Sequence, residues 1–145
     1  MMEFPYVNRR GQYYPVVPVT LHHGDREIRT EALIDSGASI STFQGDLAEP
    51  LGLVLEQGEK IYLQGIGGRV LGYVHEVQLQ IGTEQIRCKI VFSSELISSV
   101  NLLGRVGFFE HFFVSFDERN HKVIIKPYRA MLDSKKPRRG RRVAK

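Results

Sequence analysis

The chain has 145 residues, of which 42% are hydrophobic, and this size and apolar content suit one folded domain. Its single cysteine excludes an internal disulfide and a thiolate cluster for zinc, and no run of about 18 apolar residues could cross a membrane. The last eleven residues hold seven of the 20 Lys and Arg, which leaves 13 against 16 Asp and Glu. We therefore expect a soluble, mildly acidic domain with a basic tail, located in the cell and in its cytoplasm.

Extended segments dominate the first third of the sequence. Residues 14–22 are rich in valine and contain two prolines, which predicts an edge strand. Residues 27–34 alternate apolar and polar side chains as a half-buried strand does, and the two segments predict a hairpin that ends at Asp35. Another short strand is expected over 39–43, followed by one helical turn at 45–49.

The middle of the chain predicts a long hairpin. Two extended arms, 60–64 and 70–81, flank the glycine-rich segment 65–68, and the second arm has the period of two that a half-buried strand shows. The later elements expected from the pattern are strands at 85–92, 100–103, 112–116 and 122–126, and a short helix near 105–111. Cys88 lies on the apolar face of its strand, so we expect it to fill core space.

These strands define one domain with an unpatterned segment on each side. We place the domain at 14–130, after an amino-terminal lead at 1–13 and before a basic tail at 131–145. The tail consists largely of Lys, Arg, Pro and Gly and cannot bury enough surface to fold, so we expect it to be disordered. Its charge leaves open a weak contact with nucleic acid or an anionic surface, whereas the acidic body disfavours such binding by the domain.

The tripeptide Asp35-Ser36-Gly37 comes directly after an apolar strand. It is followed at once by Ala38 and another apolar strand, so the carboxylate is expected on a tight turn with a rigid support. The whole segment 32–39, Ala-Leu-Ile-Asp-Ser-Gly-Ala-Ser, resembles the signature of the retropepsin-like (retroviral-type) single-lobe aspartic proteases. That signature is an apolar strand, Asp-Thr/Ser-Gly, and then Ala and a small polar residue.

Two later segments extend the resemblance to about residues 14–127. The segment 65–68, Gly-Ile-Gly-Gly, stands about thirty residues after Asp35, where the family has its mobile flap. Residues 101–105, Asn-Leu-Leu-Gly-Arg, are similar to the family's second-half motif, in which an apolar strand passes beside the catalytic loop. We expect Arg105 to tie loops together rather than to take part in the chemistry.

The resemblance implies an all-β, retropepsin-like closed barrel of short strands with a flap hairpin and one or two short helices. It also implies an aspartic endopeptidase with Asp35 as the one catalytic carboxylate of each chain. Because no second Asp-Thr/Ser-Gly occurs, a two-lobed enzyme is excluded within one chain, and the active site must form between the chains of a homodimer. Two close carboxylates share one proton, so one activates a water while the other polarises the peptide carbonyl.

The neighbours of Asp35 take supporting roles in this scheme. By resemblance, Ser36 holds the two loops together across the dimer, Gly37 lets its backbone pack against the carboxylate pair, and Ala38 supports the loop. The flap residues that close over an extended polypeptide substrate are Gly65, Ile66, Gly67 and Gly68. No metal and no cofactor is required. A site lined by residues such as Leu33 and the neighbours of Ile34 would prefer apolar side chains.

Other interpretations remain open at this point. Taken alone, the Asp35 tripeptide is an ordinary turn composition, and 65–68 could be a flexible loop without a lid role. The runner-up function is a catalytically weak or inactive retropepsin-like module for dimerisation or peptide binding. A third hypothesis makes the basic tail primary and the domain an accessory to nucleic acid binding. His22 and His23 are adjacent, so they point to opposite faces of a strand and do not predict a metal site.

Overall fold

The computed structural model describes residues 1–65, 67–96 and 99–128. Regular structure in these residues is almost all β, and the complete helices among them are short 3-10 turns. The strands are β1 (Met2–Pro5), β2 (Val7–Arg9), β3 (Gln12–Tyr14), β4 (Val16–His23), β5 (Arg26–Ile34), β6 (Thr42–Gln44), β7 (Glu59–Gly65), β8 (Gly68–Ile81), β9 (Glu84–Ser93), β10 (Asn101–Leu103), β11 (Phe112–Asp117) and β12 (Lys122–Pro127). The 3-10 helices are η1 (Gly45–Leu47), η2 (Glu49–Leu51) and η3 (Leu55–Gln57).

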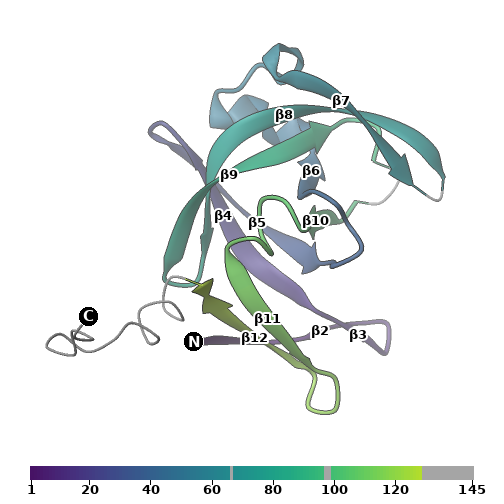
Figure 1. The fold of residues 1–145 in the computed structure, drawn as a ribbon, viewed down its shortest axis with the longest axis vertical. Helices are drawn as coiled ribbons and strands as arrows, with labels where there is room; N and C mark the ends of the chain where they lie inside the picture. The colour runs from purple at the N-terminus through teal and green to yellow at the C-terminus, as the bar shows by residue number, and fades with distance from the viewer. Residues whose placement is uncertain (66, 97–98, 129–145) are drawn as a thin grey trace, which may run out of the picture.

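Six strands close into a barrel. Their order around the ring is β4-β5-β10-β6-β9-β8, and β8 pairs in turn with β4, where Thr20 lies opposite Gln80 and His22 opposite Gln78. β7 pairs with β8 alone among the described strands, so the β7–β8 hairpin extends beyond the ring as an arm (Figure 1). Closure of the ring pairs the strand edges that would otherwise be exposed. This is the closed all-β barrel with a flap hairpin that the sequence predicts.

Alternation along the strands builds the core of the barrel. On β8, the predicted apolar face is buried, with Val77, Leu79 and Ile81 all nearly inaccessible. Cys88 lies opposite Val77 on β9 and faces the same core. Burial raises the pKa of the Cys88 thiol to about 12, which keeps it protonated and unreactive at neutral pH. Its predicted role as a core-filling residue is confirmed.

A three-stranded sheet, β1-β12-β11, lies below the barrel in the view of Figure 1. The sheet includes part of the amino-terminal lead, because Met2 of β1 pairs with Ile125 of β12. Tyr6, also from the lead, is buried in the main core cluster. The Tyr6 hydroxyl donates a hydrogen bond to Glu118 Oε1 at 3.2 Å. Burial, and after it this contact with Glu118, raises the pKa of Tyr6. The lead thus contributes to the folded core, and a domain limit at residue 14 would omit these contacts.

Two details differ from the pattern in the sequence. Residues 105–111 form turns and no helix, because Val106 donates its N–H to Ser39 and accepts the N–H of Ser41, which holds the chain extended there. β4 is an edge strand for only part of its length, since its far end pairs with β8 while Pro18 lies outside that pairing. The helical turn predicted at 45–49 is confirmed as η1 and the start of η2.

The basic tail predicted at 131–145 lies outside the described residues. Its expected disorder and its charge-driven contacts therefore stay predictions. In the described part of the chain, none of the helices has the length and apolar character needed to span a bilayer.

Candidate active site

Asp35 directly follows β5, and two neighbouring segments fix its backbone. Its N–H donates to the carbonyl oxygen of Leu103 on β10 at 2.9 Å, and the N–H of Ile34 donates to Pro15 at 3.0 Å. β5 and β10 run parallel and pair along their last residues. Because parallel strands end at the same edge of a sheet, Asp35 stands at the carboxyl ends of both strands, as predicted for a carboxylate with a rigid support.

The turn after Asp35 also fixes the orientation of the carboxylate. Oδ1 of Asp35 accepts the N–H of Gly37 at 2.9 Å, and the Asp35 carbonyl accepts the N–H of Ala38 at 3.1 Å. Asp35 is half-buried, whereas Ser36 and Gly37 are exposed. The four residues predicted around the chemistry therefore lie together on one turn, with the polar tip facing outward.

The segment 101–105, which includes strand β10, supports this turn. Gly104 donates its N–H to the hydroxyl of the buried Ser41 at 3.0 Å, and Arg105 donates its N–H to the carbonyl of Ala38 at 2.9 Å. A Cβ on Gly104 would come within 2.7 Å of the Ile40 carbonyl carbon, so only glycine allows this approach. The Gly-Arg segment thus lies beside the loop that follows Asp35, as the sequence predicts.

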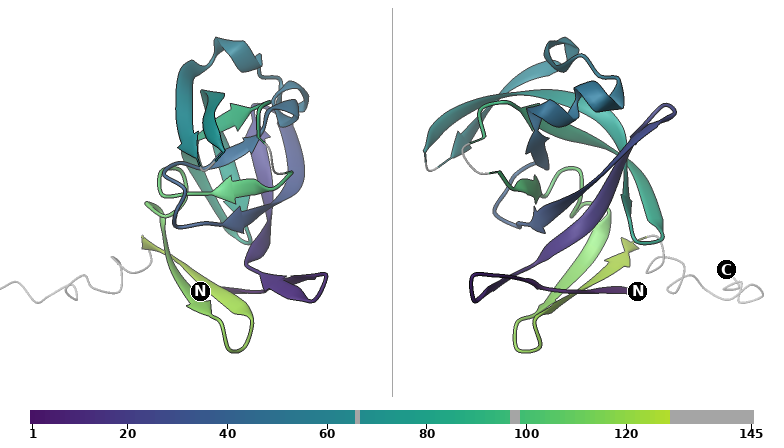
Figure 2. Two further views of the ribbon diagram at one scale, coloured as in Figure 1. Left: turned by 90° about the vertical axis from the view of Figure 1, so that its right-hand side faces the viewer. Right: turned by 180° about the vertical axis from the view of Figure 1, so that it is seen from behind.

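The predicted flap is the free end of the β7–β8 hairpin. Gly65 pairs with Gly68, whose φ of +110° favours glycine, and a Cβ on Gly68 would meet none of the described residues within 4 Å. Ile66, the expected flap-tip side chain, lies outside the described residues, while Gly67 belongs to the turn. The tip of the hairpin and the β5–β6 connection lie on the same side of the barrel, in Figure 1 and from behind in Figure 2.

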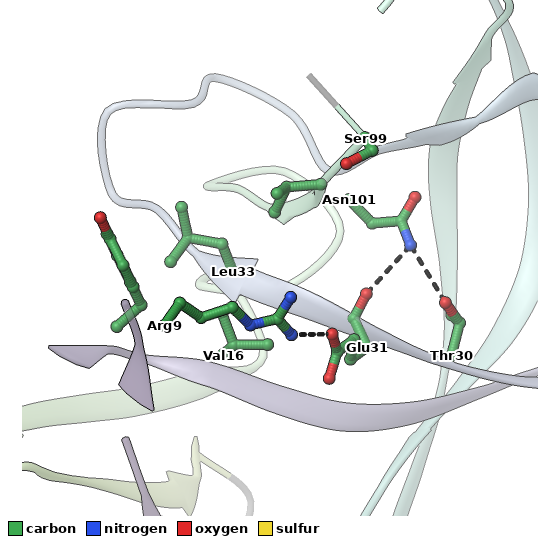
Figure 3. A pocket seen from close by; sticks show the side chains of 9 residues that line it. Arg9, Val16, Thr30, Glu31, Leu33, Ser99 and Asn101 are labelled. Carbon is green, nitrogen blue, oxygen red and sulfur yellow. Dashed lines mark hydrogen bonds and ion pairs between the residues drawn. The ribbon is translucent and has the colours of Figure 1, made fainter. Parts of the chain in front are cut away.

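A cavity of about 470 Å³ lies beside β5 (Figure 3). Its apolar lining includes Val16, Leu33 and Val100. Leu33 points away from the core, because its neighbours Ala32 and Ile34 are buried on the opposite face of the strand. The expectation that Leu33 lines the site thus fits this cavity, and Ile34 itself belongs to the core.

The sequence analysis does not predict the polar and aromatic lining of the cavity, which includes Arg9, Tyr14 and Glu31. Arg9 and Tyr14 come from the β2–β3 hairpin, and Arg9 forms an ion pair with Glu31 of β5. Glu31 could have been found, because it alternates with Leu33 on the same face of β5. Nothing local in the sequence links Arg9 or Tyr14 to β5, since their proximity depends on the tertiary fold.

The described residues contain no group of three or more His, Cys, Asp and Glu that could hold a metal ion. His22 Nε2 is 2.7 Å from Gln80 Oε1, and His23 Nδ1 is 3.0 Å from the carbonyl oxygen of Leu51. The two adjacent rings therefore contact different partners, and each stabilises the packing of its own strand or turn.

Comparisons with known proteins identify the family and the fold of the chain. The sequence matches the model of the family described as aspartyl protease over residues 17–105, a range that includes Asp35, the flap and the Gly-Arg segment. No curated protein is similar enough in sequence to match. The structure of EIAV protease complexed with the inhibitor HBY-793 is similar in fold, with a TM-score of 0.51 and 20% identity over 68% of this chain and 88% of that chain. The chain therefore belongs to the aspartyl protease family and has the retropepsin-like fold.

Proposed function

We propose that this protein is an aspartic endopeptidase that works as a homodimer, with Asp35 of each chain in one shared active site. The observation that carries the proposal is the turn itself: Asp35 is fixed by Leu103 and Gly37, while the adjacent tip of the turn is exposed. A turn that is rigid within its own chain and open to solvent is suited to meet its copy about a two-fold axis. Membership of the aspartyl protease family supports hydrolysis of peptides as the reaction class.

The proposed chemistry needs two carboxylates and one water. Two Asp35 carboxylates at hydrogen-bonding distance cannot both stay ionised, so the pair holds one proton and titrates as a unit. The ionised Asp35 takes a proton from the water while the water oxygen attacks the peptide carbonyl carbon. The protonated Asp35 donates a hydrogen bond, and then its proton, to the carbonyl oxygen. Collapse of the tetrahedral species breaks the C–N bond, and the leaving nitrogen receives a proton from the pair. Ser36 and Gly37, at the exposed tip, would contact the partner's turn.

An extended peptide is the substrate that suits this arrangement. Leu33 belongs to the strand that ends at Asp35, and with Val16 and Val100 it gives the adjacent cavity an apolar lining. Such a lining favours apolar side chains beside the scissile bond. The β7–β8 arm, with Gly65, Gly67 and Gly68 near its tip, would cover the bound peptide from the other side and exclude water.

The test is cleavage by the wild type compared with Asp35→Asn. Both proteins are incubated with a mixed peptide library from mildly acidic to neutral pH, and new termini are identified by mass spectrometry. We expect Asp35→Asn to lose at least about a thousandfold in rate, because one ionisable partner of the pair is removed. The matched control is Asp25→Asn, which changes an exposed aspartate in the β4–β5 turn and should cleave like the wild type.

The runner-up hypothesis, a peptide-binding or dimerisation module without hydrolysis, makes the opposite prediction. In that case the wild type would form dimers and bind peptides, but it would cleave no peptide that Asp35→Asn leaves intact. Sedimentation at the concentration of the assay separates this outcome from simple failure to dimerise. A chain that stays monomeric yet cleaves peptides through Asp35 would contradict the shared site.

A further inference from the structure

The β2–β3 hairpin forms a wall of the cavity beside β5. Arg9 and Tyr14 come from this hairpin, which precedes residue 17, where the match to the aspartyl protease family begins. The hairpin closes with Val7 opposite Tyr14 and Arg9 opposite Gln12, so its two cavity residues are held on adjacent strands. Both residues thus lie outside the range that the family model matches.

The spacing along β5 matches the spacing of an extended substrate. Glu31 and Leu33 occupy alternate positions of β5 and therefore share one face about 7 Å apart, and Asp35, the next position of that period, follows directly after the strand. An extended peptide also presents alternate side chains to one face about 7 Å apart. A peptide that lies along β5 with its scissile bond at Asp35 would therefore place one side chain near Leu33 and the next side chain of that face near Glu31 and Arg9.

The charged end of the cavity is fixed in position. The buried Asn101 donates from Nδ2 to the backbone carbonyl of Glu31 at 2.9 Å and to Thr30 Oγ1 at 3.2 Å, while its Oδ1 accepts the N–H of Gln44 at 2.9 Å. These bonds hold the backbone that carries the Glu31 carboxylate. In Figure 3 the guanidinium of Arg9 reaches that carboxylate across the cavity, and both side chains are 52% exposed.

We propose that the Arg9–Glu31 ion pair selects the substrate side chain two positions beyond the one beside the scissile bond, admitting neutral groups and refusing charged ones. The proposal rests on the proposed function, with the bound peptide lying along β5. Arg9 and Glu31 neutralise each other, so a charged side chain entering here meets no net attraction and must give up part of its hydration. A neutral side chain packs on Tyr14 and the aliphatic stem of Arg9 without separating the pair.

Breaking the pair from each side should shift the preference in opposite directions. Arg9→Gln leaves the Glu31 carboxylate without its partner and should favour a lysine at the selected position. Glu31→Gln leaves the Arg9 guanidinium and should favour a glutamate instead. An exposed ion pair stabilises by up to about 1 kcal/mol, so each preference should change by about fivefold. The exchange Arg9→Glu with Glu31→Arg should restore the neutral preference.

Binding measured without turnover tests this rule. Each change is made in the Asp35→Asn background, and fluorescence polarisation measures affinity for decapeptides with a central Leu-Leu pair. In these peptides one flanking position at a time carries Leu, Phe, Lys or Glu. The matched control is Arg87→Gln, which removes an exposed ion pair to Glu76, 3.0 Å long and outside this cavity, and which should leave the profile unchanged.

The possible results separate this inference from the proposed function. Opposite shifts in Arg9→Gln and Glu31→Gln support the selection rule. Profiles equal to that of the Asp35→Asn parent in both variants overturn it, and so does a lack of peptide binding by every form. If the wild type cleaves none of the peptides that Asp35→Asn binds, the endopeptidase proposal fails while the selection rule stands.

Discussion

The turn at Asp35 and the tip of the β7–β8 hairpin both depend on glycine, but for opposite reasons. Gly104 lies where two backbones meet, and a Cβ there would come within 2.7 Å of Ile40 and 2.8 Å of the Ala38 carbonyl oxygen. Gly68 instead has open space around its Cβ position and needs glycine only for its φ of +110°. The same residue type thus makes one region rigid through close packing and leaves the other free of packing. The proposed function calls for both, a fixed floor and a cover that can move.

The largest effect is expected at the packed glycine. Gly104→Ala forces a methyl group against the backbone of Ile40, and overpacking of this kind should lower the free energy of unfolding by about 3 kcal/mol. Urea denaturation followed by circular dichroism measures the change. Gly65→Ala is the matched control, because among the described residues the only neighbour of its Cβ within 4 Å is at 3.8 Å, and it should change stability by less than about 0.5 kcal/mol. Equal losses in the two variants would remove the contrast.

The hydrogen bond beneath the turn should give the next largest effect. Ser41 is fully buried and its hydroxyl accepts the N–H of Gly104, so Ser41→Ala leaves that buried donor without this acceptor. We expect a loss of about 2 kcal/mol in the free energy of unfolding. Ser115→Ala, on the half-buried part of β11, is the control and should stay within about 0.5 kcal/mol of the wild type. A neutral Ser41→Ala would show that the turn does not depend on this bond.

At the flap, a side chain should cost less. Gly68→Ala places a Cβ at a positive φ but meets no neighbour, so backbone strain of about 1 kcal/mol is the main penalty, and the hairpin end can relax part of it. The same urea denaturation measures it. A loss as large as that of Gly104→Ala would indicate that the hairpin tip is packed after all.

The smallest expected effect is that of Gly68→Ala on the rate at which Cys88 is labelled, which should not change. The pKa of its thiol is raised to about 12, so iodoacetamide at pH 8 should react about a thousandfold more slowly than with the unfolded chain. Gly68→Ala should keep this slow rate, because strain at the hairpin tip does not open the barrel. Gly104→Ala should accelerate labelling as the barrel opens more often. Faster labelling in Gly68→Ala would show that the hairpin tip and the barrel open together as one cooperative unit.

The strands and the turn at Asp35 could be predicted because their signals are local. Alternation marks β5 and β8, and the tripeptide at Asp35 follows an apolar strand directly. The absence of a helix at 105–111 could not be predicted, because Val106 is drawn into a bridge with Ile40, far away in sequence. The contribution of the amino-terminal lead to the core has the same cause, since β1 finds its partner in β12 near the other end of the domain.

The cavity residues show the same division. Leu33 was foreseen because it belongs to the strand that leads to Asp35, and Glu31 shares its alternation. Arg9 and Tyr14 reach the cavity only because the β2–β3 hairpin folds beside β5. The alternation of apolar and polar residues along the sequence does not predict that contact. The local signals thus identify the candidate catalytic turn, and the tertiary fold adds the residues that would select the substrate.

The central claim, that two Asp35 residues form one site, is tested most directly by mixing subunits. Wild type and Asp35→Asn are combined in equal amounts, allowed to exchange, and assayed at the total concentration of a wild-type reference. If both carboxylates are needed, only dimers of two wild-type chains are active, and the rate should fall to about a quarter of the reference. A rate of about one half would show that each chain works alone and would contradict the shared site.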